Sequence, residues 1–188
     1  MTTPELNAAD VIADTQLRLE KAVIGLNLCP FAKSVQIKNQ IRYFVSEART
    51  PEELLQDLIA EFEVLAEASS EKLETTLLIH PYVLTDFLDY NEFLDIADGA
   101  LEDADLDGIL QVASFHPDYQ FADTQFDDIE NFTNRSPYPT LHLLREESID
   151  KAVEAFPEAD AIYEKNIKTL RDLGLEGWRK LFIAADKS

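Results

Sequence analysis

The sequence contains very little cysteine, glycine or proline. Cys29 is the single cysteine, so no intrachain disulfide can form, and a reducing compartment is expected. The 5 glycines and 8 prolines are too few for a fibrous repeat or a disordered low-complexity chain. Long apolar runs are missing as well, and the polar, acidic N-terminus lacks the basic and apolar regions of a signal peptide. These absences predict a globular cytoplasmic protein that does not associate with membranes.

Basic residues are scarce too. The 188 residues include 16 Lys and Arg against 37 Asp and Glu, which gives a net charge of −21. Such a charge repels the phosphates of nucleic acid, so we expect no nucleic-acid partner. Hydrophobic residues make up 46% of the chain, which is enough for a substantial core. The length predicts a single domain over residues 1–188.

Apolar side chains recur at helical spacing in the N-terminal half. The first helix is predicted over residues 8–28, with Arg18 turned away from its buried face. Thr50-Pro51-Glu52-Glu53 predicts the start of a second helix, because it combines a capping box with a proline at the first helical position. Thr85 or Asp86 is predicted to cap a third helix.

Short β-branched or apolar segments alternate with these helices and predict strands. A short and a longer helix are predicted after the last strand, separated by a break at Phe156-Pro157, with Gly174 as a C-cap. The order predicts an α/β fold: a small mixed four-stranded sheet covered by helices, with three parallel neighbouring strands and an antiparallel fourth. The predicted strands cover residues 41–46, 75–79, 109–115 and 141–144.

A long segment precedes the last predicted strand and carries many aromatic residues. It spans residues 114–138, and connections of more than about 12 to 15 residues without regular structure are uncommon unless they are functional or disordered. Its aromatic content argues against a solvated linker. We therefore predict a packed flap, which we call the flap throughout. Its aromatic residues are Phe115, Tyr119, Phe121, Phe126, Phe132 and Tyr138.

Two histidines are predicted at one edge of the sheet. His80-Pro81 and His116-Pro117 end the second and third strands, because proline cannot continue a central strand. Ligands of open α/β sheets bind outside this carboxyl edge. An antiparallel fourth strand would begin there as well and bring His142 close.

Arg135 is the only basic residue of the flap. Its guanidinium suits a carboxylate or a phosphate, and Asn134, Ser136 and Tyr138 are the neighbouring candidates for substrate binding. The architectural alternative is that Arg135 pairs with one of the acidic residues of the flap itself.

Three segments resemble the motifs of a known bacterial family. They are GLNLCPFAK (25–33), SFHPDYQFA (114–122) and NRSPYPTLHLLRE (134–146), and they are similar to those of domain-of-unknown-function family 1415. The resemblance covers essentially the whole chain. The family has no assigned activity, so the resemblance implies only which segments matter, and these contain Cys29, His116 and Arg135.

No standard catalytic signature occurs in the sequence, so neither a reaction nor a cofactor can be named. The leading hypothesis is an enzyme in which His116, with Asp118 or Tyr119, performs acid–base chemistry on a small anionic metabolite that Arg135 holds. A thiol alternative makes Cys29 the nucleophile, activated by His116 or His80.

Two further alternatives stay open. A zinc or iron enzyme would use the three histidines as ligands, although no H-x-x-x-H or E-x-x-H spacing supports it. A non-catalytic module would bind a small molecule or a protein segment through the aromatic flap. The proposed metal ligands are His80, His116 and His142, with Asp118, Asp86 or Cys29 completing the shell.

Overall fold

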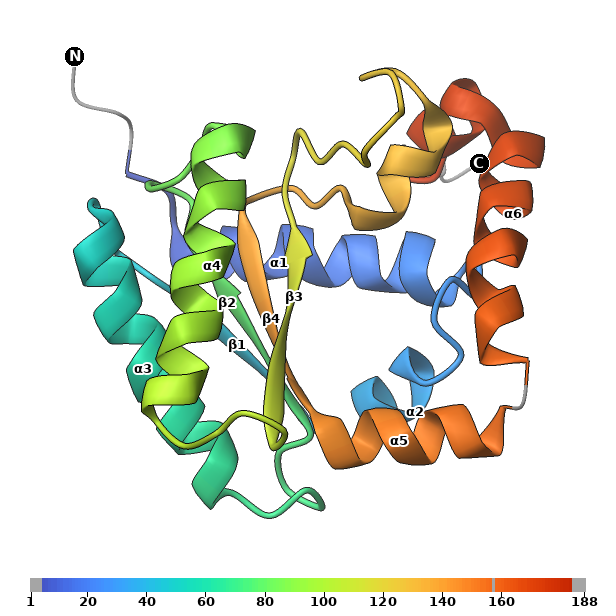
Figure 1. The fold of residues 1–188 in the computed structure, drawn as a ribbon. Coiled ribbons are helices and arrows are strands. Elements are labelled where there is room, and N and C mark those ends of the chain that lie inside the picture. The colour runs from blue at the N-terminus through green and yellow to red at the C-terminus, as the bar shows by residue number, and fades with distance from the viewer. Residues whose placement is uncertain (1–4, 157, 184–188) are drawn as a thin grey trace.

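The computed structural model describes residues 5–156 and 158–183 and shows a four-stranded sheet with helices on both faces (Figure 1). The strands are β1 (Ile41–Val45), β2 (Thr75–Ile79), β3 (Leu110–Phe115) and β4 (Thr140–Arg145). The α-helices are α1 (Ala8–Arg18), α2 (Ala32–Ile37), α3 (Pro51–Glu67), α4 (Phe87–Asp103), α5 (Glu146–Ala155) and α6 (Ala159–Lys180). A π-helix η1 (Leu19–Ile24) follows α1, and a 3₁₀-helix η2 (Ile129–Asn134) lies within the flap.

The strand order is β1-β2-β4-β3, with β1 parallel to β2 and β4 antiparallel to both of its neighbours. The predicted α/β fold, the mixed four-stranded sheet and the antiparallel fourth strand are confirmed. The predicted pairing of the third strand with the second is wrong, because β4 lies between them. Leu141 and Leu143 of β4 have no exposed surface, as expected for a central strand. The unit β2-α4-β3 is thus a split β-α-β motif.

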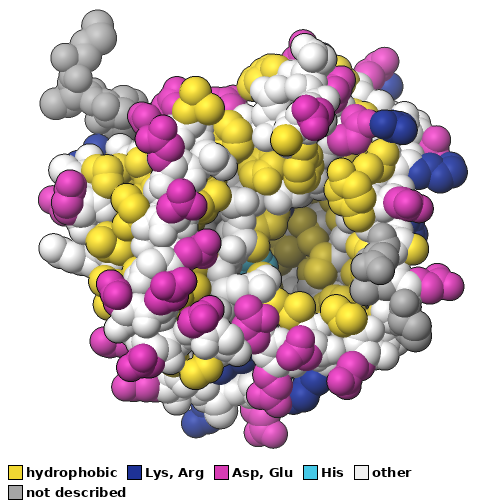
Figure 2. Space-filling model, viewed as in Figure 1, with side chains coloured by type: hydrophobic (Ala, Val, Ile, Leu, Met, Phe, Trp, Pro, Cys, Tyr) yellow, Lys and Arg dark blue, Asp and Glu magenta, His cyan; other side chains and the backbone are white. Residues whose placement is uncertain are grey.

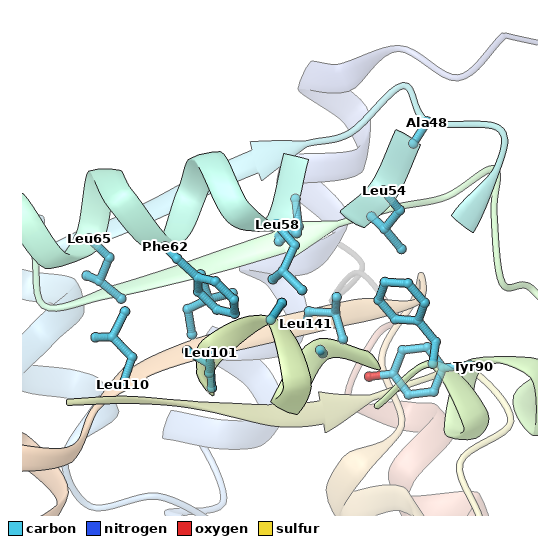
Figure 3. Packing of buried hydrophobic residues seen from close by; sticks show 14 of the residues in the cluster. Ala48, Leu54, Leu58, Phe62, Leu65, Tyr90, Leu101, Leu110 and Leu141 are labelled. Carbon is cyan, nitrogen blue, oxygen red and sulfur yellow. The ribbon is translucent and has the colours of Figure 1, made fainter. Parts of the chain in front are cut away.

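The main core lies between the sheet and helices α3 and α4. Leu58, Phe62 and Leu65 of α3 point toward the sheet, where Leu65 lies opposite Leu110, and all four are almost completely buried (Figure 3). Local sequence signals fix both helices in place. The capping box at Thr50 forms as predicted, and the Asp86 side chain accepts hydrogen bonds from two backbone N–H groups at the start of α4.

Tyr90 joins α4 to the ends of β3 and β4. Its buried hydroxyl donates a hydrogen bond to the carbonyl of Thr140 at 2.8 Å and accepts one from the N–H of Phe115 at 3.0 Å. The ring also lies 5.8 Å from the ring of His80 and 5.0 Å from that of His116. Tyr90 therefore holds together the strand ends that face the flap.

Replacing Tyr90 with phenylalanine is expected to lower the free energy of unfolding by about 1 to 3 kcal/mol, because the buried carbonyl of Thr140 and the partly buried N–H of Phe115 lose their partner. Urea denaturation measures the difference. Tyr82→Phe is the matched control, since the Tyr82 hydroxyl also bonds two backbone groups, those of Leu6, at an exposed position. Equal losses in both variants would contradict the role assigned to Tyr90.

Two predictions about the first helix are wrong, its end and the outward position of Arg18. The first helix changes to π geometry after Arg18 and ends at Ile24, and Arg18 is only 9% exposed instead of lying on the outer face. Gly174 adopts the non-helical angles φ 68° and ψ 172° within α6, so the first helical segment ends there as predicted, and a second segment continues beyond this kink to Lys180. Of the predicted break at Phe156-Pro157, Phe156 follows the end of α5, and Pro157 lies outside the described residues.

Within the described residues, no helix combines the length and the apolar character needed to cross a membrane.

Candidate functional site

His116 lies where it was predicted, at the carboxyl end of β3, but its imidazole is fully engaged. Nε2 donates to the carbonyl of Leu84 at 3.1 Å, and Nδ1 accepts from the backbone N–H of Asp118 at 3.0 Å. The residue has no exposed surface. Burial lowers the pKa of His116, so the ring is neutral at neutral pH. No ring nitrogen is left for a ligand, and the bonds of His116 position the loop that contains Leu84.

The two predicted acid–base partners of His116 point elsewhere. Asp118 is exposed and contacts the imidazole through its backbone N–H. The Tyr119 ring packs between aromatic neighbours, 5.2 Å from Phe87 and 5.0 Å from Phe121. This geometry gives His116 a structural role and gives the predicted His116–Asp118 pair no route for proton transfer.

His80 is buried beside His116 on the same face of the sheet. Its Nδ1 donates to the carbonyl of Val83 at 2.9 Å, and its Nε2 is a buried atom without a hydrogen-bond partner in the described residues. Burial lowers the pKa of His80 to about 4. His80 and His116 thus come together as predicted, through backbone contacts and with Tyr90 against both rings.

His142 lies on the opposite face of the sheet. In the pairing register it stands beside Leu77 and Ala113, whereas Leu141 and Leu143 face α3 and α4. The three histidines therefore do not converge. In the described part of the chain, no group of three His, Cys, Asp or Glu side chains is arranged to hold a metal ion.

Arg135 is held inside the flap. Its guanidinium lies 4.4 Å from the ring centre of Phe126 and 4.5 Å from that of Phe132. Nε donates to the carbonyl of Tyr119 at 3.1 Å, and Nη2 donates to that of Phe126 at 2.5 Å. Burial lowers its pKa. Arg135 forms no ion pair within the described residues, so the alternative in which it pairs with a flap carboxylate does not occur there.

The other candidates around Arg135 bond within the flap or to α1. Asn134 donates to the carbonyl of Ser114 at 3.0 Å, and Ser136 donates to that of Tyr138 at 2.6 Å. The Tyr138 hydroxyl donates to the carboxylate of Asp14 at 2.7 Å, which ties the flap to α1. Burial, together with Asp14, raises the pKa of Tyr138 to about 12. These contacts fix the shape of the second half of the flap.

A pocket of about 480 Å³ opens between the flap, α1 and the end of α6, and we call it the flap pocket. Its volume lies within the range of small-molecule sites. Both ends of the flap contribute to it, and α1 and α6 supply the rest of the wall. It is lined by Asp14, Leu17, Arg18, Pro117, Phe132, Arg135, Ser136, Pro137, Trp178 and Phe182.

Arg18 is the functional candidate that sequence reasoning missed. Its Nε donates to the carbonyl of Arg135 at 2.5 Å and its Nη2 to that of Thr133 at 2.8 Å. The other N–H groups of the guanidinium have no acceptor among the described residues, and Arg18 forms no ion pair there. Burial lowers its pKa to about 10, and the group is still a cation at neutral pH. A buried cation without a counter-charge is costly, so an anion would stabilise it.

A second open space lies over the sheet face that carries His142. Figure 2 shows a deep hollow with mainly hydrophobic walls at the place where Figure 1 has β3 on one side, α6 on the other and α5 below. Histidine surface is visible in its wall, and His142 is the one histidine that keeps exposed surface. Leu77 and Ala113 beside it are also only partly buried. We call this space the sheet-face hollow.

The ring of Phe115 contacts both Arg18, at the flap pocket, and His142, at the sheet-face hollow. The guanidinium of Arg18 lies 5.1 Å from the centre of its ring, and the ring of His142 lies 5.8 Å from it. Arg18 lines the flap pocket, and its charge acts on His142 as well. A cation of α1 and an imidazole of β4 therefore share one aromatic neighbour at the end of β3.

Cys29 is a free, half-buried thiol in the turn after η1. The side chain of Asn166 donates a hydrogen bond to the carbonyl of the preceding residue, Leu28, at 2.9 Å. Neither His80 nor His116 bonds to the thiol, because both rings bond to backbone groups of other loops. The arrangement offers no activating base for Cys29 from the two histidines that were predicted to provide one.

The fold is that of an α/β protein with a small mixed sheet, and part of one sheet face stays open beside a buried arginine that forms no ion pair within the described residues. A family model described as "Protein of unknown function (DUF1415)" matches residues 10–180, and the chain belongs to this family. No curated protein and no solved structure matches it.

Proposed function

We propose that this chain is a cytoplasmic enzyme that acts on a small anionic metabolite, and that it binds the anionic group of this metabolite in the flap pocket through Arg18. The observation that carries the proposal is the buried guanidinium of Arg18, which has N–H groups without acceptors and no carboxylate partner in the described residues.

The chemistry of the pocket supports an organic anion. A guanidinium suits a carboxylate or a phosphate, because its N–H groups match two oxygens at once. Trp178, Phe132 and Phe182 provide an apolar wall for the rest of the molecule. Asp14, the acidic residue of the wall, already accepts a hydrogen bond from Tyr138. The rest of the surface is strongly acidic, so the attraction for an anion is local to this pocket.

Anion binding is tested by thermal unfolding with inorganic phosphate, succinate and benzoate, each compared with sodium chloride of equal ionic strength. A ligand at one hundred times its Kd stabilises a protein by about 2.7 kcal/mol, which raises the Tm of a chain of this size by several degrees. At least one anion is expected to stabilise the wild-type protein and to have a much smaller effect on Arg18→Gln.

The comparison with Arg18→Gln is needed because phosphate stabilises most proteins by exclusion from their surface. Leu17→Trp fills the flap pocket without altering Arg18 and is expected to lose the same stabilisation. Arg171→Gln, at an exposed position of α6, is the matched control and should respond like the wild-type protein. Equal anion responses in all four proteins would refute the proposal. Binding without turnover of any bound metabolite would favour the non-catalytic module.

A further inference from the structure

We propose that His142 and Thr75 form a general base that faces the sheet-face hollow, and that an anion held by Arg18 activates it. This inference rests on the proposed function, because the anion is the one proposed for the flap pocket. It assigns a catalytic role to a histidine that the sequence singled out only as a metal ligand.

Thr75 fixes the tautomer of His142. The hydroxyl of Thr75 donates to the carbonyl of Leu143 at 2.5 Å, so its proton is committed to that bond. Nε2 of His142 lies 2.7 Å from the same hydroxyl oxygen and must therefore be the donor in their contact. The proton of the neutral imidazole is thus on Nε2, and Nδ1 carries the free lone pair. Thr75 is a positioning residue for His142.

Nδ1 of His142 faces open space. It has no hydrogen-bond partner among the described residues, and it does not belong to the buried polar atoms without a partner, which are in Thr76 and His80. The open space on this side of β4 is the sheet-face hollow. A lone pair in an apolar hollow, held by a fixed second nitrogen, is the arrangement of a general base. In the reaction, Nδ1 would take a proton from a C–H or O–H group of the substrate and become the second N–H of an imidazolium.

The charges around His142 explain why an anion would be needed. Burial, and next the positive charge of Arg18, lower the pKa of His142 to about 4, so the empty site is a weak base at neutral pH. The neighbours of His142 in the sheet, Leu77 and Ala113, carry no charge, and Tyr43 beyond Leu77 is neutral because burial raises its pKa to about 12. An anion on Arg18 cancels the repulsion and moves the pKa toward the working pH.

Nitrogen-15 NMR of the three histidine rings tests the inference, and His142→Gln assigns the His142 signal because glutamine keeps a donor near Thr75. Without an added anion, His142 is expected to carry its proton on Nε2 and to stay neutral from pH 8 to 5. Saturating phosphate, or whichever of the three anions stabilises the protein most, should raise its titration midpoint by about one pH unit or more. The midpoint should not move in Arg18→Gln.

Thr75→Val is the second variant, and it should change the tautomer of His142 while leaving the protein folded. A proton on Nδ1 in the wild-type protein would overturn the inference. So would an unchanged midpoint in the presence of an anion that stabilises the wild-type protein through Arg18. The absence of any stabilising anion would instead refute the proposed function, and the two failures are thereby separated.

Discussion

Replacing Arg145 with methionine is expected to lower the free energy of unfolding by about 3 kcal/mol, because one partly buried guanidinium satisfies the end of a long helix. Nη2 of Arg145 donates to the carbonyls of Leu65 and Ala68 at the end of α3, at 2.8 and 2.7 Å. Nη2 and Nε both donate to the carbonyl of Leu73, just before β2. The last carbonyls of a helix have no partner within the helix, so methionine would leave these partly buried groups without their present donor.

Urea denaturation at neutral pH measures this loss. Arg171→Met is the matched control, because Arg171 is exposed and its ion pair with Glu130 is expected to contribute less than about 1 kcal/mol. Arg145→Lys should lie between the wild-type protein and Arg145→Met, since a single ammonium group cannot reach all three carbonyls. A loss for Arg145→Met no larger than that for Arg171→Met would show that the carbonyls find other partners.

Acid is expected to destabilise the protein between pH 6.5 and pH 4 through His80. The folded state lowers the pKa of His80 from 6.5 to about 4, so in this range the unfolded chain binds a proton that the folded protein does not. Stability is therefore complete above pH 6.5 and falls as the pH decreases, by about 1.4 kcal/mol for each pH unit. The whole contribution of His80 is about 3 kcal/mol at pH 4.

His80→Asn isolates this effect. The asparagine amide can still donate to the carbonyl of Val83, but it does not titrate, and it removes the buried nitrogen that has no partner. The difference in the free energy of unfolding between the two proteins should shrink or reverse as the pH falls from 7 to 4.5. Both proteins contain the same carboxylates, so the contribution of carboxylate titration to the free energy of unfolding cancels in this difference. A difference that does not change with pH would mean that His80 titrates with the same pKa in the folded and unfolded states.

The local elements of the fold could be predicted because their causes are local. Thr50 and Glu53 lie three residues apart and satisfy each other's backbone at the start of α3, whatever the rest of the chain does. Strand β2 has the predicted bounds because its apolar run is limited on both sides. The position of β4 could not be predicted in this way. Whether it pairs at the edge of the sheet or between β2 and β3 depends on contacts between distant parts of the chain.

The buried position of Arg18 was indicated by its spacing in the sequence, but its charge led to the opposite prediction. Val11, Thr15, Arg18 and Ala22 follow one another at helical spacing, and all four are buried. Spacing alone would have placed Arg18 on the buried face. Its charge favoured the exposed face, since arginine is almost never fully buried without a partner. The helical spacing of this stripe therefore outweighs the charge of Arg18 in deciding which face of α1 is buried.

For His80 and His116, the sequence predicted the position at the edge of the sheet but not the orientation of the rings. Strand ends followed by proline located His80 and His116 correctly. The orientation of each ring, however, depends on the loop that follows β2, where the carbonyls of Val83 and Leu84 accept from them. Leu84 adopts φ 55°, a conformation that the sequence gives no reason to expect for leucine. Residue type and spacing therefore locate a side chain, and the loop geometry decides whether it is available to a ligand.

The central place of β4 has a consequence for synthesis on the ribosome. When the chain has emerged as far as Phe115, β1 and β2 can already pair, but β3 has no neighbour with which it pairs in the finished sheet. Both β2 and β3 must keep an edge open until residues 140–145 arrive. The sheet can therefore close only late in translation, and a nascent chain stalled within the flap would expose two strand edges that invite aggregation.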